Sequence, residues 1–238
     1  MGHTKLALRR TRRGSPVSFR SAVLAVLLPV AFVSCLAPMR DYQGHTIFNP
    51  LYLFYLESPK RDRWQKPEQV LDALRLPAGA VVADIGAGGG YFTEKFANRV
   101  GPTGHVYATD VQEIMLRRLR TRAADHHLAN VTVVRAEFDD PKLPPETCDL
   151  AFFSSVYKEI SHRVEYMQKL RGCLKKDGRV AILEYRPETK SPGPPVRYRL
   201  TEARVIGEMQ AAGFVVQEKF DFLPRENFLV FGVKPPAN

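Results

Sequence analysis

The sequence predicts an α/β fold in which a doubly wound sheet is mostly parallel and ends in an antiparallel pair of strands. Short apolar runs rich in β-branched residues alternate with helix-compatible segments along residues 67–212. This alternation is typical of parallel sheets whose strands are joined by helices. The last two apolar runs, residues 215–220 and 228–233, have no helical segment between them. Such a short connection favours antiparallel pairing of these two strands.

Each predicted element has a local signal. Pro67 suits the first turn of a helix, and Val70 and Leu74 give that helix an apolar face. Thr201 is a typical N-cap for a helix that continues to Ala212. The other predicted helices are residues 91–100, 111–124 and 166–174, and the parallel strands are residues 81–84, 106–110, 131–135, 150–154 and 180–184, the last one after a turn at residues 177–178.

The segment of residues 81–92, VVADIGAGGGYF, indicates a ligand site. An apolar run ends in Asp84, and a turn with four glycines follows before the next helix: Gly86, Gly88, Gly89 and Gly90. Glycines adopt positive φ and lack the Cβ atoms that would block a ligand. The Asp84 carboxylate would repel a pyrophosphate and attract an ammonium group, and Tyr91 replaces the third glycine of the dinucleotide-binding pattern. The segment therefore favours S-adenosylmethionine (AdoMet) over a nicotinamide dinucleotide, with a glycine turn that binds no ligand as the alternative.

Residues 84–90, DIGAGGG, resemble motif I (D-x-G-x-G-x-G) of class I AdoMet-dependent methyltransferases. The resemblance extends over most of residues 67–233 and is closest to the small-molecule methyltransferases of ubiquinone and menaquinone biosynthesis. It implies a Rossmann-like doubly wound sheet, AdoMet as the cofactor and a small-molecule methyl acceptor. Within motif I, it implies cofactor-binding roles for Asp84, Gly86, Gly88 and Gly90.

Two further strand ends carry residues suited to the nucleoside part of AdoMet. Asp110 ends the second predicted strand, where an acid can accept hydrogen bonds from both ribose hydroxyls. The resemblance implies that role, and a solvated strand-end acid is the alternative. Glu137 stands where the family usually has an aspartate that contacts the adenine amino group. Phe138 beside it is suited to stack on the base or flank it.

Residues 149–157, DLAFFSSVY, resemble motif IV, where a strand passes beneath the methyl donor. Ser154 and Ser155 are therefore candidate contacts to the methionine moiety. Methyl transfer is an in-line displacement that needs alignment and a deprotonated nucleophile. Glu159 and His162, on the acceptor side, are the candidate bases. The alternative is that both are polar residues at the start of a helix.

Several other residues have two open interpretations. Arg61 and Trp64 form a lid over the cofactor, or a packed Trp accompanies an exposed Arg. Tyr91 packs over the donor or begins the core face of its helix. Arg197 and Arg199, in the proline-rich loop after the fifth strand, meet an acidic substrate group or belong to a solvated loop. No metal-ligand set is predicted.

The net charge of +10 does not indicate nucleic-acid binding. Seven of the 35 basic residues precede the first acid, Asp41, which leaves 28 basic residues against 25 acids in the rest of the chain. A nearly balanced domain lacks the basic footprint that DNA or RNA requires. We therefore expect no nucleic-acid partner.

The basic excess belongs to a predicted targeting or anchor segment, residues 1–40. Residues 1–20 are basic and free of acids, and residues 21–33 form an apolar run that is short for a membrane-spanning helix. Residues 32–35, FVSC, resemble a bacterial lipobox, in which Cys35 would be lipidated. The alternatives are an uncleaved anchor, a cytoplasmic protein or a mitochondrial presequence. Membrane contact is expected through this segment.

The rest of the chain is predicted to comprise an aromatic linker or lid, residues 41–66, and the methyltransferase domain, residues 67–238. Because AdoMet is kept inside cells, export would conflict with methyl transfer. The rival interpretation is therefore an exported or membrane-tethered binding protein that retains the fold without turnover. Cys148 and Cys173 are predicted to be buried and reduced, with a disulfide as the alternative in an oxidising compartment.

Overall fold

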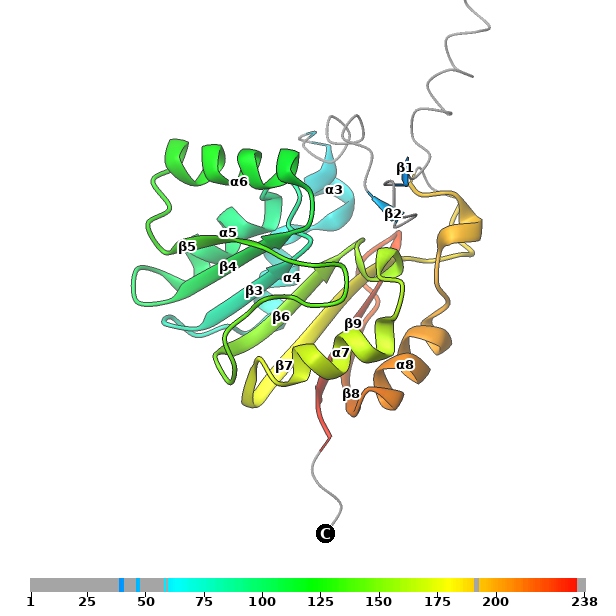
Figure 1. Ribbon diagram of the computed structural model, residues 1–238. Helices are drawn as coiled ribbons and strands as arrows, with labels where there is room; N and C mark the ends of the chain where they lie inside the picture. The colour runs from blue at the N-terminus through cyan, green and yellow to red at the C-terminus, as the bar shows by residue number, and fades with distance from the viewer. Residues whose placement is uncertain (1–38, 41–45, 48–57, 59, 191–192, 235–238) are drawn as a thin grey trace, which may run out of the picture. The chain divides into compact units, whose positions relative to one another are not determined.

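A seven-stranded sheet forms the centre of the structure (Figure 1). The computed structural model describes residues 39–40, 46–47, 58, 60–190 and 193–234. The sheet has the order β5-β4-β3-β6-β7-β9-β8. Its strands are β3 (Val81–Ile85), β4 (His105–Asp110), β5 (Val131–Arg135), β6 (Cys148–Ser154), β7 (Leu174–Tyr185), β8 (Phe214–Phe220) and β9 (Glu226–Val233). A separate antiparallel pair consists of β1 (Met39–Arg40) and β2 (Thr46–Ile47).

The pairing confirms the predicted mostly parallel sheet. Strands β3 to β7 pair in parallel, whereas β9 runs antiparallel to both β7 and β8. The chain proceeds outward from β3 through β4 to β5, and then returns to the other side of β3 to form β6. The strand order therefore reverses between β3 and β6, and ligands of such sheets bind at the carboxyl ends of the strands beside this switch point.

Helices cover both faces of the sheet (Figure 1). One face packs against α4 (Pro67–Leu74), α5 (Tyr91–Val100) and α6 (Glu113–Asp125), and the other against α7 (Arg163–Arg171) and α8 (Glu202–Ala211). Both faces of the central strands are therefore apolar, as expected for buried parallel strands. The short helices are α3 (Arg61–Gln65), η2 (Tyr157–Glu159) and η3 (Val196–Tyr198).

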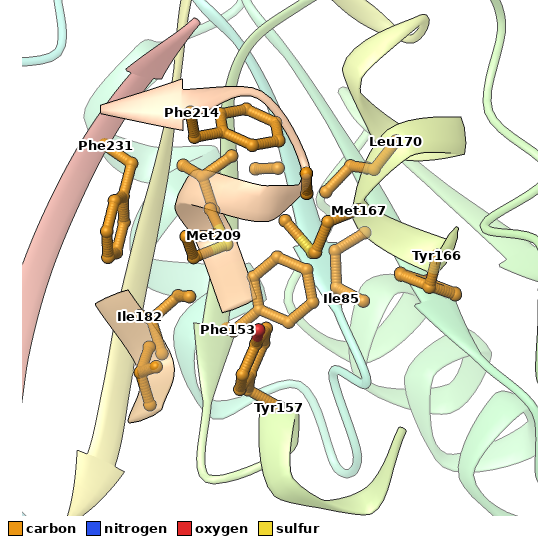
Figure 2. Close-up of a cluster of buried hydrophobic side chains, with 14 of the residues drawn as sticks. Ile85, Phe153, Tyr157, Tyr166, Met167, Leu170, Ile182, Met209, Phe214 and Phe231 are labelled. Atoms are coloured by element: carbon orange, nitrogen blue, oxygen red, sulfur yellow. The ribbon is translucent and has the colours of Figure 1, made fainter. Parts of the chain in front are cut away.

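Figure 2 shows the core beneath α7 and α8. Phe153 from β6 packs among Met167 of α7 and Met209 of α8, and all three side chains are fully buried. Burying one such side chain contributes roughly 1.5–3 kcal/mol. On the opposite face, Phe92 and Phe96 of α5 pack against Phe152. The alternation of Phe152 and Phe153 thus anchors β6 to both helical layers.

The predicted boundaries at β7 were wrong. Helix α7 ends at Arg171 instead of residue 174, and β7 begins at Leu174. The expected turn at residues 177–178 is an irregularity within β7, where the pairing register with β6 shifts. A Cβ on Gly178 would lie 2.9 Å from the Cys148 carbonyl oxygen. The glycine therefore permits close approach of two strands instead of a turn.

The two domain cysteines agree with the predicted reduced state. Cys148 and Cys173 are both buried and free, so the disulfide alternative is not formed in this structure. Helix α8 begins after Thr201, whose side chain accepts a hydrogen bond from the Arg204 backbone N–H, as predicted for an N-cap.

The predicted targeting segment, including Cys35, lies outside the described residues except for residues 39–40. All described residues belong to one structural unit, Leu36–Asn238. Within the described part of the chain, none of the helices combines the length and apolar character needed to cross a membrane.

Candidate active site

The turn after β3 has the backbone conformation that its glycines predict. Gly86, Gly88 and Gly90 have φ values of +63°, +58° and +85°. A Cβ on Gly86 would lie 2.4 Å from Cγ2 of Val156, whereas a Cβ on Gly88 would meet no protein atom within 4 Å. Gly86 is therefore required by packing, and Gly88 faces open space that a ligand can occupy.

Asp110 closes this turn from the neighbouring strand. Its carboxylate accepts hydrogen bonds from the backbone N–H groups of Gly88 at 3.1 Å and Gln112 at 2.9 Å. Burial raises the pKa of the Asp110 carboxyl group, and these N–H donors oppose that rise. The structure thus brings two predicted cofactor residues, Gly88 and Asp110, into direct contact.

Asp84 lies beneath the glycine turn. It is buried, and its carboxylate accepts a hydrogen bond from the Thr93 hydroxyl at 2.6 Å. Burial raises the pKa of Asp84 to about 6, and the Thr93 hydrogen bond and the Arg61 charge limit the rise. This contact ties the end of β3 to the first turn of α5.

Helix α3 brings a set of polar side chains to the carboxyl end of β6. Gln65 donates through Nε2 to Ser154 Oγ at 3.0 Å and to both carboxylate oxygens of Glu226, each at 3.0 Å. Arg61 donates to the Gln65 side-chain oxygen and, at 3.4 Å, to Ser154 Oγ. Ser155 donates to Glu226 Oε1 at 3.2 Å. Of these residues, Arg61, Gln65 and Glu226 are buried.

Sequence reasoning missed Gln65 and Glu226 entirely. The predicted antiparallel direction of the last strands was the feature of the sequence that could have indicated the position of Glu226. Because β9 is antiparallel to β7, its first residue, Glu226, lies at the same edge of the sheet where β6 ends. Burial raises the pKa of Glu226 to about 7, and the charge of Arg61 and the hydrogen bond from Gln65 limit the rise.

Helix α3 also rests on the start of α5. The guanidinium carbon of Arg61 lies 3.9 Å from the centroid of the Tyr91 ring, and the Tyr91 hydroxyl donates to Asp62. Trp64 is buried and packs against the Tyr185 ring, with centroids 5.7 Å apart. The predicted alternative of an exposed arginine beside a packed tryptophan is therefore wrong, because Arg61 is buried together with Trp64.

A second buried carboxylate lies beside this set. Glu184 of β7 accepts a hydrogen bond at Oε1 from the Lys158 backbone N–H at 3.1 Å. Its Oε2 has no hydrogen-bond partner among the described residues and lies 3.8 Å from the Lys158 ammonium. An unsatisfied buried oxygen is costly in an apolar interior and is a place where a ligand or water can donate.

The remaining candidates lie apart from the buried set. Glu137 is exposed, and its carboxylate pairs with Lys142 at 3.2 Å, while Phe138 beside it is half-buried. His162 is exposed at the N-cap of α7. Glu159 is half-buried and pairs with the Lys158 ammonium at 3.3 Å.

Arg199 has a structural role that neither interpretation foresaw. It is buried and donates to the backbone carbonyls of Pro194, Arg186 and Thr189, at 2.8, 3.1 and 2.7 Å. The guanidinium thus closes the loop after β7. Arg197 lies over the Tyr198 ring, with its guanidinium carbon 4.7 Å from the ring centroid.

Residues 76–221 match the family model described as a methyltransferase domain. The chain belongs to this methyltransferase family. A SAM-dependent methyltransferase from Aquifex aeolicus has a similar structure, with a TM-score of 0.76 and 28% identity, covering 79% of this chain and 100% of that one.

Other similar proteins carry methyltransferase names. The ubiquinone/menaquinone biosynthesis C-methyltransferase UbiE of Ectopseudomonas mendocina is 30% identical over 159 residues, which are 66% of this chain and 60% of that protein. The methyltransferase described here therefore spans less than two thirds of that relative. The Haemonchus contortus phosphoethanolamine N-methyltransferase 2, solved with S-adenosylhomocysteine (AdoHcy), shares the fold at 16% identity and a TM-score of 0.58, over 73% of this chain and 53% of that one.

These findings confirm the predicted fold, enzyme class and cofactor. The chain contains a domain of the AdoMet-dependent methyltransferase type. Its residues also fit the cofactor on structural grounds. Gly88 leaves open space at the end of β3, and the Asp110 carboxylate lies beside it. The methyltransferase thus presents a glycine-rich turn and an adjoining acid, as a nucleoside ligand requires.

Proposed function

We propose that this methyltransferase transfers a methyl group to a small-molecule acceptor held at the carboxyl end of β6 and β7. The observation that carries the proposal is the polar set in which buried Gln65 and Glu226 are hydrogen-bonded to partly buried Ser154, at the end of the strand next to β3. Such a set, enclosed by α3, suits a compact acceptor better than an extended polymer. The names of the UbiE-type relatives, which refer to C-methylation in quinone biosynthesis, favour a hydroxylated ring compound.

The positions of the predicted cofactor residues along the edge of the sheet support the following proposed roles. Gly86, Gly88 and Gly90 let the backbone approach AdoMet, and Asp110 accepts hydrogen bonds from the ribose hydroxyls. Glu137 and Phe138 bind or flank the adenine at the end of β5. Ser154 and Asp84 then lie on the methionine side, across the switch point. This order matches the strand order, in which β4 and β6 flank β3.

The chain's contribution to the reaction is mainly positional. AdoMet supplies an electrophilic methyl group when bound. The protein aligns the acceptor with it, excludes water beneath α3 and accepts the proton that the acceptor loses. Holding two reactants in line converts an encounter into an intramolecular step, which can contribute about 7–11 kcal/mol to lowering the barrier. Glu159 and His162 remain the candidate bases that the sequence predicts.

Labelled methyl transfer tests the acceptor class. The full chain is incubated with AdoMet labelled in its methyl group and with three acceptor pools: small hydroxylated aromatic compounds, RNA and unfolded protein. The proposal predicts label in the small-molecule pool and loss of that label in Gly88→Ala. Label confined to RNA or protein would contradict it.

We also propose that residues 1–40 tether the enzyme to a membrane through lipidated Cys35. The basic, acid-free start and the following apolar run support this proposal. Each buried methylene of an acyl chain contributes about 0.8 kcal/mol to membrane partitioning. Fatty-acid labelling should mark the wild type and not Cys35→Ser, and the variant should leave the membrane fraction. An unlabelled, full-length wild type would contradict lipidation, whereas cleavage elsewhere and recovery in an organelle would indicate a presequence.

A further inference from the structure

Glu226 is a buried carboxylate that side-chain hydrogen bonds link to the end of β6, one of the two strands at the switch point. It begins β9 and pairs in register with Tyr185 of β7. Its side chain is 0% exposed. The hydrogen-bond donors that reach it, the Gln65 amide and the Ser155 hydroxyl, are neutral. A carboxylate held by neutral donors in a buried site retains the capacity to accept a proton.

Gln65 joins this carboxylate to the cofactor side of the site. The same Nε2 atom that donates to Glu226 donates to Ser154 Oγ at 3.0 Å. If Asp110 binds the ribose as proposed above, the nucleoside would lie on the β4 side of β3, and β6 lies on the other side. The methionine end of a cofactor bound in this way would then lie on the β6 side, where Ser154 ends the strand. Glu226 lies one amide group beyond that serine.

Other charged or titratable groups surround Glu226. Two carboxylates have separate partners, because Asp84 is bound by Thr93 and Glu184 lies beside Lys158. Glu226 is linked to Ser154 through a single side chain, which distinguishes it from both. Arg61 of α3, Tyr91 of α5 and Glu184 of β7 interact with it electrostatically, and Tyr185 of β7 pairs with it in register. Asp84 and Lys158 are one step further away, because Asp84 interacts with Arg61 and Lys158 with Glu184.

We propose that Glu226 receives the proton that the acceptor loses. The sulfonium loses its positive charge in the reaction, and the protonated Glu226 carboxylate loses its negative charge at the same time. This inference rests on the function proposed above. The acceptor forms a bond to the methyl carbon, and the carbon–sulfur bond breaks with its electron pair left on sulfur. The acceptor's O–H, N–H or activated C–H proton passes to the Glu226 carboxylate. The site therefore keeps the same total charge before and after transfer.

This assignment also restricts the acceptor. A buried carboxylate repels an acceptor that is already anionic. It suits a neutral molecule that releases a proton during the reaction, such as a phenol or a hydroquinone ring. Unlike the exposed His162 and the half-buried, lysine-paired Glu159, Glu226 is fully buried.

The test uses both forms of the cofactor and needs no acceptor. Calorimetry of the full chain at about pH 7, in buffers with different ionisation enthalpies, measures the protons taken up when AdoHcy or AdoMet binds. Because AdoHcy lacks the sulfonium charge, its complex favours a protonated Glu226. We expect binding of AdoHcy to be accompanied by the uptake of on the order of half a proton more than binding of AdoMet. Glu226→Gln should abolish this difference, and Glu218→Gln, a carboxylate that pairs with Arg75, should retain it.

The comparison of wild type with Glu226→Gln cancels the ionisation of the ligand's own amino group. An equal difference in both proteins would overturn the inference while leaving the cofactor site intact. Loss of the difference in Asp84→Asn alone would assign the proton to Asp84 and also overturn it. Failure of both ligands to bind would overturn the cofactor site and the inference together.

A second measurement applies if Glu226→Gln does not fold. In the wild type, the ratio of the AdoHcy to the AdoMet dissociation constant should rise roughly fivefold between about pH 6 and 8, because deprotonated Glu226 favours the cationic ligand. A ratio that is constant or falls over this range would overturn the inference without any variant.

Discussion

The Asp110 carboxylate accepts a hydrogen bond from the Gly88 backbone N–H at 3.1 Å. The acid that should bind the ribose and the glycine that should adjoin the cofactor therefore form one structural unit. Asp110 orients the turn, and the turn leaves the space that a nucleoside would fill. Substitutions at the two residues should therefore weaken cofactor binding for different physical reasons.

Gly88→Ala should abolish AdoMet binding while the chain remains folded. The added Cβ enters open space at the site, and positive φ costs roughly 1–2 kcal/mol for an L-residue. Gly101→Ala is a matched control, because Gly101 also has positive φ and open space, at the end of α5. Calorimetry should show binding to the control alone. Normal AdoMet binding by folded Gly88→Ala would mean that the turn is only structural.

Gly86→Ala, unlike Gly88→Ala, should act mainly by lowering the stability of the fold. Its Cβ would lie 2.4 Å from Cγ2 of Val156, so the variant must displace the segment after β6. Overpacking of this kind costs typically 1–3 kcal/mol, in addition to the backbone strain. We expect a clear loss of stability in urea unfolding, larger than that of Gly88→Ala. Equal stability of the two variants would contradict this distinction.

Asp110→Asn should make the binding free energy of AdoHcy less favourable by about 1.5–3 kcal/mol, the range for a hydrogen bond to a charged group. The variant also disturbs the Gly88 contact, so an analogue of AdoHcy without the ribose 2′-hydroxyl separates the two effects. The analogue should bind the wild type more weakly than AdoHcy does, and Asp110→Asn should bind both alike. If the variant still discriminates between them, another residue binds the ribose.

Glu226→Gln should stabilise the protein at alkaline pH. Burial raises the pKa of Glu226 from 4.5 to about 7, so the folded state binds the proton more tightly than the unfolded state. The free energy of unfolding therefore falls as pH rises from the unfolded pKa through the folded one. At about pH 8 the variant should be more stable than wild type by about 2–3 kcal/mol. Urea unfolding should show this gain fading toward about pH 4.5, and a destabilised variant at alkaline pH would contradict it.

Cys148 and Cys173 should react slowly in the native protein. Burial raises the pKa of Cys148 to about 12 and also raises that of Cys173, so little thiolate is present near neutral pH. Alkylation followed by peptide mapping should label both only after unfolding, without any reductant. A requirement for reductant would reveal a disulfide and contradict the free thiols.

The placement of the predicted cofactor residues at one edge of the sheet could be predicted from the sequence. Asp84, Gly88, Asp110 and Ser154 each lie at or just after the end of a parallel strand, and all such ends meet at one edge. A one-dimensional pattern of apolar runs and turns therefore places them together. The strand boundaries near them were also accurate, because the β-branched runs end where buried structure ends.

The polar set beneath α3 could not be predicted in the same way. Gln65 reaches Ser154 across 89 positions and Glu226 across 161 positions of the sequence. Arg61 and Glu226 belong to residue types that are almost always exposed unless paired. Their burial depends on partners from α3, β6 and β9, which no local pattern links. The misplaced turn at Gly178 has a similar origin, because the close contact with Cys148 is a tertiary property.

Titration of the full chain with AdoMet and AdoHcy tests the central claim most directly, since it requires only that the glycine turn and Asp110 form a cofactor site. We predict one site per chain for each ligand, with dissociation constants in the micromolar range, about −8 kcal/mol at 1 μM, and competition between the two. A folded chain that binds neither ligand at millimolar concentration would contradict the claim.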